Sequence, residues 1–225
     1  MKRKIITTGD GSKTIQIEEW NEQYHSIHGA LQEAVHVFIK TGLQYCHSRG
    51  REESLKNISI LEIGFGTGLN ALLTAIEAEK LKLKIDYVGV EAYPVSKEEL
   101  LQLNYTQIIP KISKNLVEDI HNSKWEKYES ISPYFSIQKR KQFFNDITDK
   151  EAFDLIYFDA FGARVQPELW TEDIFKIMFE AIKQNGVLVT YSAKGSVRRA
   201  MQTVGFTVER LPGPPGKREM LRATK

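Results

Sequence analysis

Three glycines at alternate positions follow a short apolar segment of the chain. Residues 58–63 are mostly aliphatic, which predicts a buried strand, and Gly64, Gly66 and Gly68 end it. The residues from Leu69 onward are helical in composition, so the chain is expected to turn sharply from strand to helix. Glycines let a backbone approach a ligand closely, and the start of a helix favours an anionic group such as a carboxylate. The pattern therefore predicts a ligand-binding turn, with a purely structural glycine turn as the alternative.

The spacing distinguishes between two kinds of nucleotide site. A dinucleotide-binding turn would carry a third glycine at the position of Leu69, so an NAD site is disfavoured. The observed spacing, with the acidic Glu62 just before it, resembles the S-adenosylmethionine site of class I methyltransferases. That resemblance implies S-adenosylmethionine as the cofactor and a set of cofactor-binding residues around the turn: Glu62, Gly64, Phe65, Gly66, Thr67, Gly68 and Asn70.

Three further carboxylates are expected at the same edge of the sheet. Glu91 and Asp159 end two apolar segments, and Asp146 lies in a loop beyond another. Ligands of open α/β sheets bind outside the carboxyl ends of the strands, so these side chains are expected close to the turn. Under the same resemblance Glu91 and Asp146 would bind the ribose hydroxyls and the adenine amino group, and Asp159 would lie beside the reacting centre. Each carboxylate alone is more often a helix cap or a salt-bridge partner.

The elements that would position these residues alternate between apolar strands and helices. Strands are expected at 58–63, 85–90, 152–158 and 187–191, and helices at 69–80, 171–183 and 195–204. Such alternation predicts an α/β fold with a parallel sheet covered on both faces, here of the class I methyltransferase, Rossmann-like type. Residues 1–50 are expected to form a β-hairpin and helix extension, packed on a methyltransferase domain of residues 51–225.

Other segments give weaker signals. A hairpin is predicted at 5–8 and 14–17, a helix over 31–39, a loop over 50–57, one or two strands within 123–144, and two last strands around 212–216. A capping box that starts at Ser96 predicts a further helix, and Asn185 with Gly186 is read as the stop signal of the helix at 171–183.

Composition narrows the class of protein. The 225 residues include 41% hydrophobic residues and carry a net charge of +2, which excludes intrinsic disorder. A single cysteine excludes a disulfide framework, and together with five histidines that lack zinc spacing it predicts no metal. No apolar run approaches the length of a transmembrane helix. We therefore expect a cytoplasmic protein without a membrane partner, and nothing in the sequence indicates more than a monomer.

Charge is unevenly spread along the chain. From Lys194 to the C-terminus eight Lys and Arg residues are opposed by only two Glu residues. A basic patch of this kind is compatible with a polyanionic partner, and a solvated surface is the alternative. The candidates for phosphate contacts in this region are Arg198, Arg199, Lys217 and Arg218, and Glu219 lies among them.

Several separate motifs resemble one family over nearly the whole chain. This is the methyltransferase domain of the bifunctional tRNA wobble-uridine enzyme MnmC, with its stand-alone relatives called MnmD. The matching segments are Tyr24-His25-Ser26, 29–33, 64–70, 159–161, 166–170, 197–199 and 216–221. The resemblance implies transfer of the methyl group of S-adenosylmethionine to the amine of 5-aminomethyl-(2-thio)uridine in tRNA. The flavin domain of the bifunctional relatives would not fit within this chain, so no FAD and no oxidoreductase activity are expected.

An amine attacks through its lone pair, so it must lose its proton before it can accept a methyl group. Asp159 is the predicted catalytic residue, either as the base or as a group that only orients the amine. Tyr24 and His25 are candidates to face the substrate, although His25 is equally explained by loop packing. Phe161 and Tyr191 are candidates to stack on a base, although an aromatic residue at a strand end is more often part of the core.

Two other functions fit the same fold. One is an aminopropyltransferase of the spermidine-synthase type, and the other is a tRNA-binding module without turnover. The match at 216–221 argues against the first, and the joint presence of Glu91, Asp146 and Asp159 argues against the second.

Overall fold

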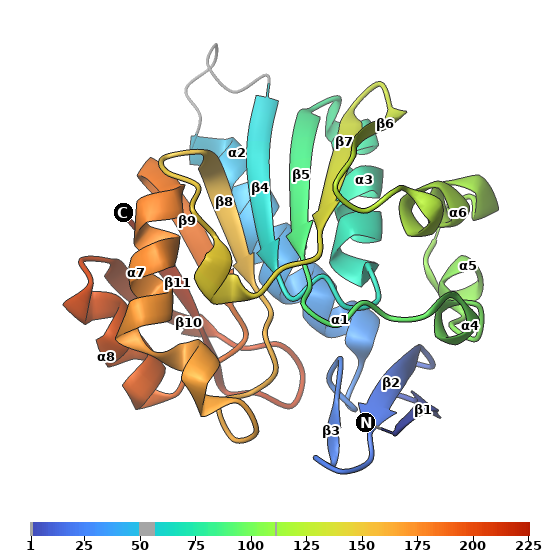
Figure 1. The fold of residues 1–225 in the computed structure, drawn as a ribbon, viewed down its shortest axis with the longest axis horizontal. Helices are drawn as coiled ribbons and strands as arrows, with labels where there is room; N and C mark the ends of the chain where they lie inside the picture. Colours follow the sequence, from blue (N-terminus) through green and yellow to red (C-terminus); the bar gives the residue numbers. More distant parts are fainter. Residues whose placement is uncertain (1, 50–56, 111) are drawn as a thin grey trace.

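An eight-stranded sheet runs through the centre of the molecule (Figure 1). The computed structural model describes residues 2–49, 57–110 and 112–225. The strands follow the spatial order β10-β11-β9-β8-β4-β5-β7-β6, in which the pairs from β9 to β7 are parallel and the outer pairs are antiparallel. Their bounds are β4 Asn57–Ile63, β5 Lys84–Val90, β6 Tyr128–Ser132, β7 Phe135–Arg140, β8 Phe153–Phe158, β9 Ile182–Thr190, β10 Thr207–Pro212 and β11 Glu219–Thr224.

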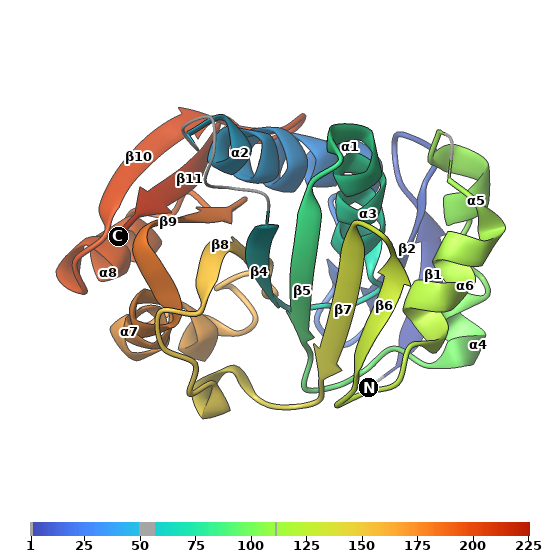
Figure 2. The ribbon, with the colours of Figure 1, turned by 90° about the horizontal axis from the view of Figure 1, so that it is seen from above.

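Helices cover both faces of this sheet, as Figure 2 shows from above. The central strands are buried on both sides, so their residues are apolar without alternation. In β8, Leu155 and Tyr157 pack in the core with α3, whereas Ile156 and Phe158 pack in a second core with α7 and α8. The helices are α3 Leu69–Leu81, α4 Lys97–Leu100, α5 Tyr105–Ile108, α6 Lys114–Asn122, α7 Glu172–Ala181 and α8 Gly195–Thr203, with the short 3-10 helices η2 Phe144–Asp146 and η3 Pro167–Trp170.

The N-terminal segment adds a small sheet and a long helix. Strands β1 (Arg3–Thr7), β2 (Lys13–Ile17) and β3 (Glu22–Gln23) form an antiparallel sheet, which lies beneath the carboxyl ends of β4 and β5 in Figure 1. The helix runs through α1 (Ala30–Ala34), the π-helical η1 (Val35–Gln44) and α2 (Tyr45–Arg49). Contacts of η1 with β8, β9 and α3 make this helix part of one layer over the sheet.

Most predicted elements are present, and the α/β fold class is confirmed. The hairpin, the capping box at Ser96 and the last two strands are confirmed, and the uncertain region 123–144 forms the antiparallel pair β6 and β7. The predicted loop over 50–57 and the boundary between 50 and 51 fall on residues 50–56, which lie outside the described residues. Of the helices in the described part of the chain, none has both the length and the apolar character needed to cross a membrane.

The prediction for the end of one helix is wrong. The helix predicted over 171–183 ends at Ala181, and the chain passes directly into β9. Asn185 and Gly186 lie inside this strand, where the register between β8 and β9 shifts, and Asn185 adopts a positive φ of 64°. The pair that suggested a helix stop therefore marks an irregularity within a strand.

Candidate functional site

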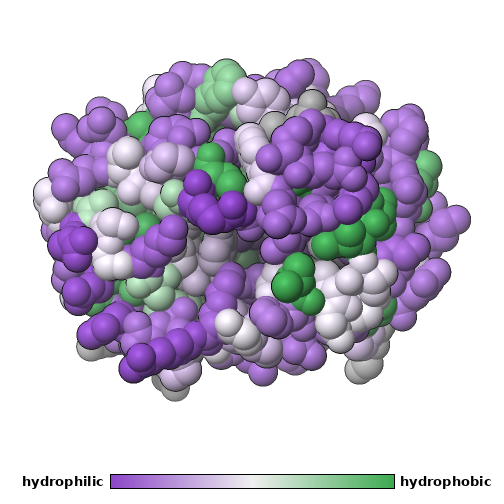
Figure 3. Space-filling view, turned by 90° about the horizontal axis from the view of Figure 1, so that it is seen from below, coloured by the Kyte–Doolittle hydropathy of each residue, from purple (hydrophilic) through white to green (hydrophobic). Residues whose placement is uncertain are grey.

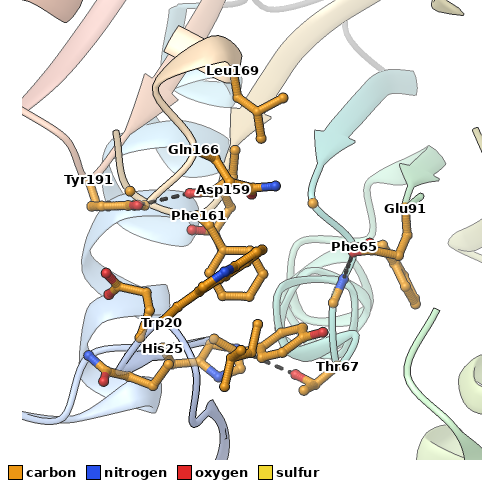
Figure 4. Close-up of a pocket in the computed structure, with 18 of the residues that line it drawn as sticks. Trp20, His25, Phe65, Thr67, Glu91, Asp159, Phe161, Gln166, Leu169 and Tyr191 are labelled. Atoms are coloured by element: carbon orange, nitrogen blue, oxygen red, sulfur yellow. Dashed lines mark hydrogen bonds between the residues drawn. The ribbon is translucent and has the colours of Figure 1, made fainter. Parts of the chain in front are cut away.

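A cavity of about 720 Å³ opens at the carboxyl ends of β4, β5 and β8. This volume is in the usual range for a small-molecule site. Its walls come from the N-terminal sheet, the loops after these three strands and the loop between β10 and β11. Figure 4 shows Phe65 and Glu91 on one side, with Asp159, Phe161 and Tyr191 on the other.

The geometry of the turn after β4 requires glycine. Gly64, Gly66 and Gly68 all have positive φ angles, of 87°, 51° and 78°. A Cβ on Gly64 would lie 2.6 Å from the Asp159 carbonyl oxygen, and one on Gly66 would lie 3.0 Å from the Tyr24 ring. Side chains are therefore excluded here both by strain and by space. The turn leads directly into α3 at Leu69, as the sequence predicts.

Glu91 is fixed by the backbone of this same region. Its carboxylate accepts a hydrogen bond from the Gly66 amide at 3.0 Å and another from the Tyr93 amide at 2.9 Å. Two backbone donors hold the side chain in one position at the cavity wall, where it can accept hydrogen bonds from a pair of hydroxyl groups.

Thr67 anchors the turn to surrounding elements. Its hydroxyl lies 2.6 Å from the Tyr105 hydroxyl and 3.4 Å from His25 Nε2, and its carbonyl lies 3.0 Å from His121 Nε2. Burial lowers the pKa of His25 to about 4, and Nδ1 of this ring lies 2.8 Å from the Thr14 hydroxyl. His25 therefore lines the cavity as a neutral ring and also joins the N-terminal sheet to the turn.

Asp159 follows β8 and faces the cavity. Its carboxylate accepts a hydrogen bond from Asn70 Nδ2 at 2.9 Å, and the same amide donates to Glu62 at 2.8 Å. Burial and, to a smaller extent, the Glu33 carboxylate raise the pKa of Asp159 to about 7, against the opposing effects of the Asn70 hydrogen bond and Lys217. A carboxylate with this pKa is suited to take up a proton at neutral pH.

Three predicted cofactor residues do not line the cavity. Glu62 is buried beneath it, where burial raises its pKa well above the ordinary value, and it reaches Asp159 only through Asn70. Asp146 is exposed on η2, and its neighbours Phe143 to Asn145 line the cavity in its place. Gly68 shapes the turn without facing the ligand space. The remaining predicted cofactor residues lie at the wall: Gly64, Phe65, Gly66, Thr67, Asn70, Glu91 and Asp159.

Aromatic rings form another part of the wall. Phe161 meets the ring of Tyr24 edge-to-face at 4.9 Å and that of Trp20 at 5.7 Å. Tyr191 donates from its hydroxyl to the Ala160 carbonyl at 2.8 Å, which fixes its ring beside the loop after β8. These rings offer flat apolar surfaces of the kind that bind a planar base.

The predicted basic residues are divided between the cavity and the outer surface. Lys217 lines the cavity, where it forms an ion pair with Glu33. Arg198, Arg199 and Arg218 lie outside it, the first two on α8, and Glu219 pairs with Arg210 at 3.7 Å. Figure 3 shows the face seen from below as mainly hydrophilic around a central hollow, with hydrophobic side chains beside the hollow.

Sequence reasoning missed several wall residues. Glu33 lies within a matched segment and is 7% exposed, but nothing in the local pattern distinguishes it from a helix-surface glutamate. The other wall residues that were not predicted are Arg3, Trp20, Tyr93, Phe143, Asn145, Gln166 and Leu169. Within the described part of the chain there is no group of His, Cys, Asp or Glu that could hold a metal ion.

The wall fits S-adenosylmethionine in two respects. The glycine turn lines the cavity with backbone at Gly64 and Gly66, where no side chain enters the ligand space, and Glu91 is held with its acceptors at the wall. A family model described as S-adenosyl-L-methionine-dependent methyltransferase matches residues 111–225, just over half of the chain. The chain belongs to this family, and S-adenosylmethionine is its cofactor.

Individual relatives agree with this assignment. The tRNA 5-methylaminomethyl-2-thiouridine biosynthesis bifunctional protein MnmC of Leptospira interrogans is 30% identical over 91% of this chain and 32% of the relative. The chain thus spans about a third of the length of the curated relatives it matches. The crystal structure of MNMC2 from Aquifex aeolicus superposes with a TM-score of 0.80 at 28% identity, covering 99% of this chain and 70% of that one. The resemblance drawn from the sequence motifs is confirmed.

Spermidine synthase from Thermotoga maritima shares the fold. Its TM-score is 0.58 at 12% identity, and the match covers 99% of this chain and 68% of that one. At this identity the likeness concerns the architecture of the chain and does not extend to the reaction.

Proposed function

We propose that the protein methylates the primary amine of 5-aminomethyl-(2-thio)uridine at the wobble position of tRNA, giving 5-methylaminomethyl-(2-thio)uridine. The names of its relatives supply the substrate class. The observation that carries the proposal is a buried carboxylate, Asp159, whose pKa is raised to about 7 in a cavity that also presents aromatic rings. The proposal covers methyl transfer alone, without flavin chemistry.

Amine methylation requires a group that takes up a proton. S-adenosylmethionine, when bound, supplies a methyl group on a sulfonium. With the cofactor bound, the amine nitrogen would form a bond to that methyl carbon while the carbon–sulfur bond broke, and the electron pair of the broken bond would remain on sulfur. Asp159 accepts the proton that the nitrogen loses, while Asn70 holds the carboxylate in place. Loop backbone and aromatic side chains keep the reacting groups close and exclude water.

We assign the walls of the cavity as follows. Glu91 binds the ribose hydroxyls, the turn at 64–67 holds the amino-acid end of the cofactor, and Phe143 to Asn145 face the adenine where Asp146 does not reach. Trp20, Tyr24 and Phe161 hold the uracil by stacking, and His25 supports them. Arg198, Arg199 and Arg218 lie outside the cavity and would contact tRNA phosphates. We further propose that the protein acts as a monomer in the cytoplasm.

Transfer of labelled methyl groups tests this function. The substrate is bulk tRNA that retains aminomethyl-uridine, and the product is identified after digestion to nucleosides. We expect label in 5-methylaminomethyl-(2-thio)uridine with the wild type and a large loss of label with Asp159→Asn. The matched control Asp173→Asn, at the exposed start of α7, should give as much label as the wild type. Binding of S-adenosylmethionine without transfer of label to the tRNA would refute the proposed substrate assignment. Turnover only with the decarboxylated cofactor and an amine would indicate an aminopropyltransferase instead.

A further inference from the structure

A partly buried ion pair faces the cavity, and the chemistry described above does not use it. Lys217 comes from the loop between β10 and β11, and Glu33 from the first turn of α1. The Lys217 ammonium contacts Glu33 Oε1 and lies 3.8 Å from the centre of the Tyr191 ring. Both residues line the same cavity as Asp159, although they are 184 positions apart in the sequence.

The two groups that contact this ammonium are each fixed by a hydrogen bond to the backbone. Glu33 Oε2 accepts a hydrogen bond from the Ser26 amide at 3.0 Å, so the carboxylate cannot turn away. The Tyr191 hydroxyl donates to the Ala160 carbonyl at 2.8 Å, which presents the face of the ring to the cation. A carboxylate and an aromatic face together form a fitted site for an ammonium group.

Stability alone explains this pair poorly. The Glu33 side chain is 9% exposed and that of Lys217 is 31% exposed, so desolvation of the carboxylate and solvent screening of the ammonium both reduce the net free energy of folding that the pair contributes. Its location beside a titrating carboxylate gives it a different consequence, because every charge near Asp159 changes how tightly that carboxylate binds a proton.

The charged and polar groups around Asp159 come from several elements. Glu33 on α1 favours the protonated carboxyl, and Lys217 favours the carboxylate. Asn70 on α3 donates a hydrogen bond to Asp159, and the Glu62 carboxyl of β4 lies on the far side of that amide. Tyr191, which follows β9, stays neutral because burial raises its pKa well above the ordinary value. Lys217 is thus the cation among the described groups that act on Asp159.

We propose that Lys217 is a positioning residue for methyl transfer: held by Glu33 and Tyr191, its fixed positive charge keeps Asp159 ionised and disfavours a second ammonium on the bound substrate. The inference rests on the proposed function, in which Asp159 receives the proton of an amine. It also gives Lys217 a role inside the cavity in place of a phosphate contact. Glu33 serves to hold the cation and to balance its charge.

The direction of each substitution follows from the charges. Lys217→Met leaves the Glu33 carboxylate unpaired beside Asp159, so the pKa of Asp159 rises, by about one pH unit for a neighbouring charge. Glu33→Gln leaves Lys217 unopposed and lowers that pKa. The double variant removes both charges and brings the pKa back toward the wild-type value. Lys217→Arg keeps the charge and the ring contact and leaves the pKa close to wild type.

The primary measurement needs no tRNA. The protein is labelled with ¹³C at aspartate carboxyl carbons, Asp159 is assigned with Asp159→Asn, and its titration is followed by NMR in the four variants. The control Lys183→Met breaks an ion pair with Asp154, which is 2.9 Å long and lies outside the cavity. We expect opposite shifts in the two single variants, recovery in the double variant, and no shift in the control.

Methylation kinetics then distinguish a failure of the role proposed for Lys217 from a failure of the proposed function. In the variants the acid limb of kcat against pH should move in step with the NMR titration, and Lys217→Arg should restore the wild-type limb. Unchanged titration of Asp159 in Lys217→Met and in Glu33→Gln, with methyl transfer intact in the wild type, would overturn the role of Lys217 alone. Titration shifts as expected, with no methylation of tRNA by the wild type, would overturn the proposed function alone. If Lys217→Met fails to fold, the other variants still decide the question.

Discussion

The two sides of the cavity are built in different ways. On the side that we propose holds the cofactor, formed by residues 64–67, Leu69, Asn70 and Glu91, the wall is built on the backbone of the glycine turn and a carboxylate held by two backbone amides. On the substrate side the wall consists of side chains from four distant parts of the chain, namely Trp20, Tyr24, Glu33, Phe161, Tyr191 and Lys217. Asp159 stands between the two sides, bonded to Asn70 and influenced by Lys217.

This difference determines which amino-acid substitutions each side of the cavity can tolerate. A wall of backbone atoms allows little variation, because the turn has one conformation that only glycine adopts without strain. A wall of side chains can change one residue at a time and keep its shape. We therefore expect substitutions on the cofactor side to act on binding and fold together, and those on the substrate side to act on catalysis or tRNA affinity alone.

The largest effect is expected at the junction of the two sides. Asp159→Asn keeps the shape of the side chain but removes the proton acceptor, so methyl transfer should fall by about 10² to 10⁴-fold. Cofactor affinity, measured by calorimetry, should change much less, because Glu91 and the turn are untouched. An equal loss of cofactor affinity would show that Asp159 acts mainly as part of the cofactor wall.

Gly64→Ala tests the rigidity of the cofactor side. The new Cβ would meet the Asp159 carbonyl at 2.6 Å in a backbone conformation with φ of 87°, at a cost of about 1–3 kcal/mol. We expect a lower melting temperature together with a loss of cofactor binding. Gly162→Ala is the matched control, because its φ is ordinary and its nearest neighbour, the Tyr191 hydroxyl, is 3.7 Å away. Two variants that behave alike would contradict the role of the positive φ.

How far the sequence predicts each side follows from the same difference. The turn, the strand before it and the carboxylates that end the strands are local patterns, so Gly64, Gly66, Glu91 and Asp159 could be placed in advance. Asp146 lies outside the cavity wall, which its neighbours Phe143 to Asn145 line, because a strand end does not fix the direction of side chains in the 3-10 turn that follows.

The substrate side is much less visible in the sequence. Glu33 and Lys217 meet only because α1 and the β10–β11 loop converge at the cavity, a contact over 184 positions that no local periodicity encodes. The segment that carries Trp20 is held at the cavity wall by Arg164. The Arg164 side chain donates a hydrogen bond to the Trp20 carbonyl at 3.1 Å and forms an ion pair with Glu22 at 2.8 Å. Such residues become recognisable only when the fold, or a relative with the same motifs, shows which segments meet.

Phe161→Ala tests the aromatic wall of the substrate side. The ring contacts both Tyr24 and Trp20, and the loss of one stacking surface for a base costs about 1–3 kcal/mol. We expect KM for tRNA to rise by about 10 to 100-fold, with cofactor affinity within about twofold of wild type. Phe161→Tyr, which retains the ring, serves as the control and should remain close to wild type. Weaker cofactor binding in Phe161→Ala would place this ring on the other side of the cavity.

The smallest effect expected is the dependence on pH, and its sign follows from Asp159. The pKa of this carboxyl is raised to about 7, so below pH 7 the group is protonated and cannot accept the proton of the amine. The slope of kcat against pH should therefore be close to tenfold per unit below about pH 7 and flatten above it. Cofactor affinity should remain nearly constant over the same range, because the hydrogen bonds of Glu91 to the Gly66 and Tyr93 amides do not depend on Asp159. A parallel decline of both quantities at low pH would mean that protonation disturbs the cofactor side as well, and the two sides would then titrate as one unit.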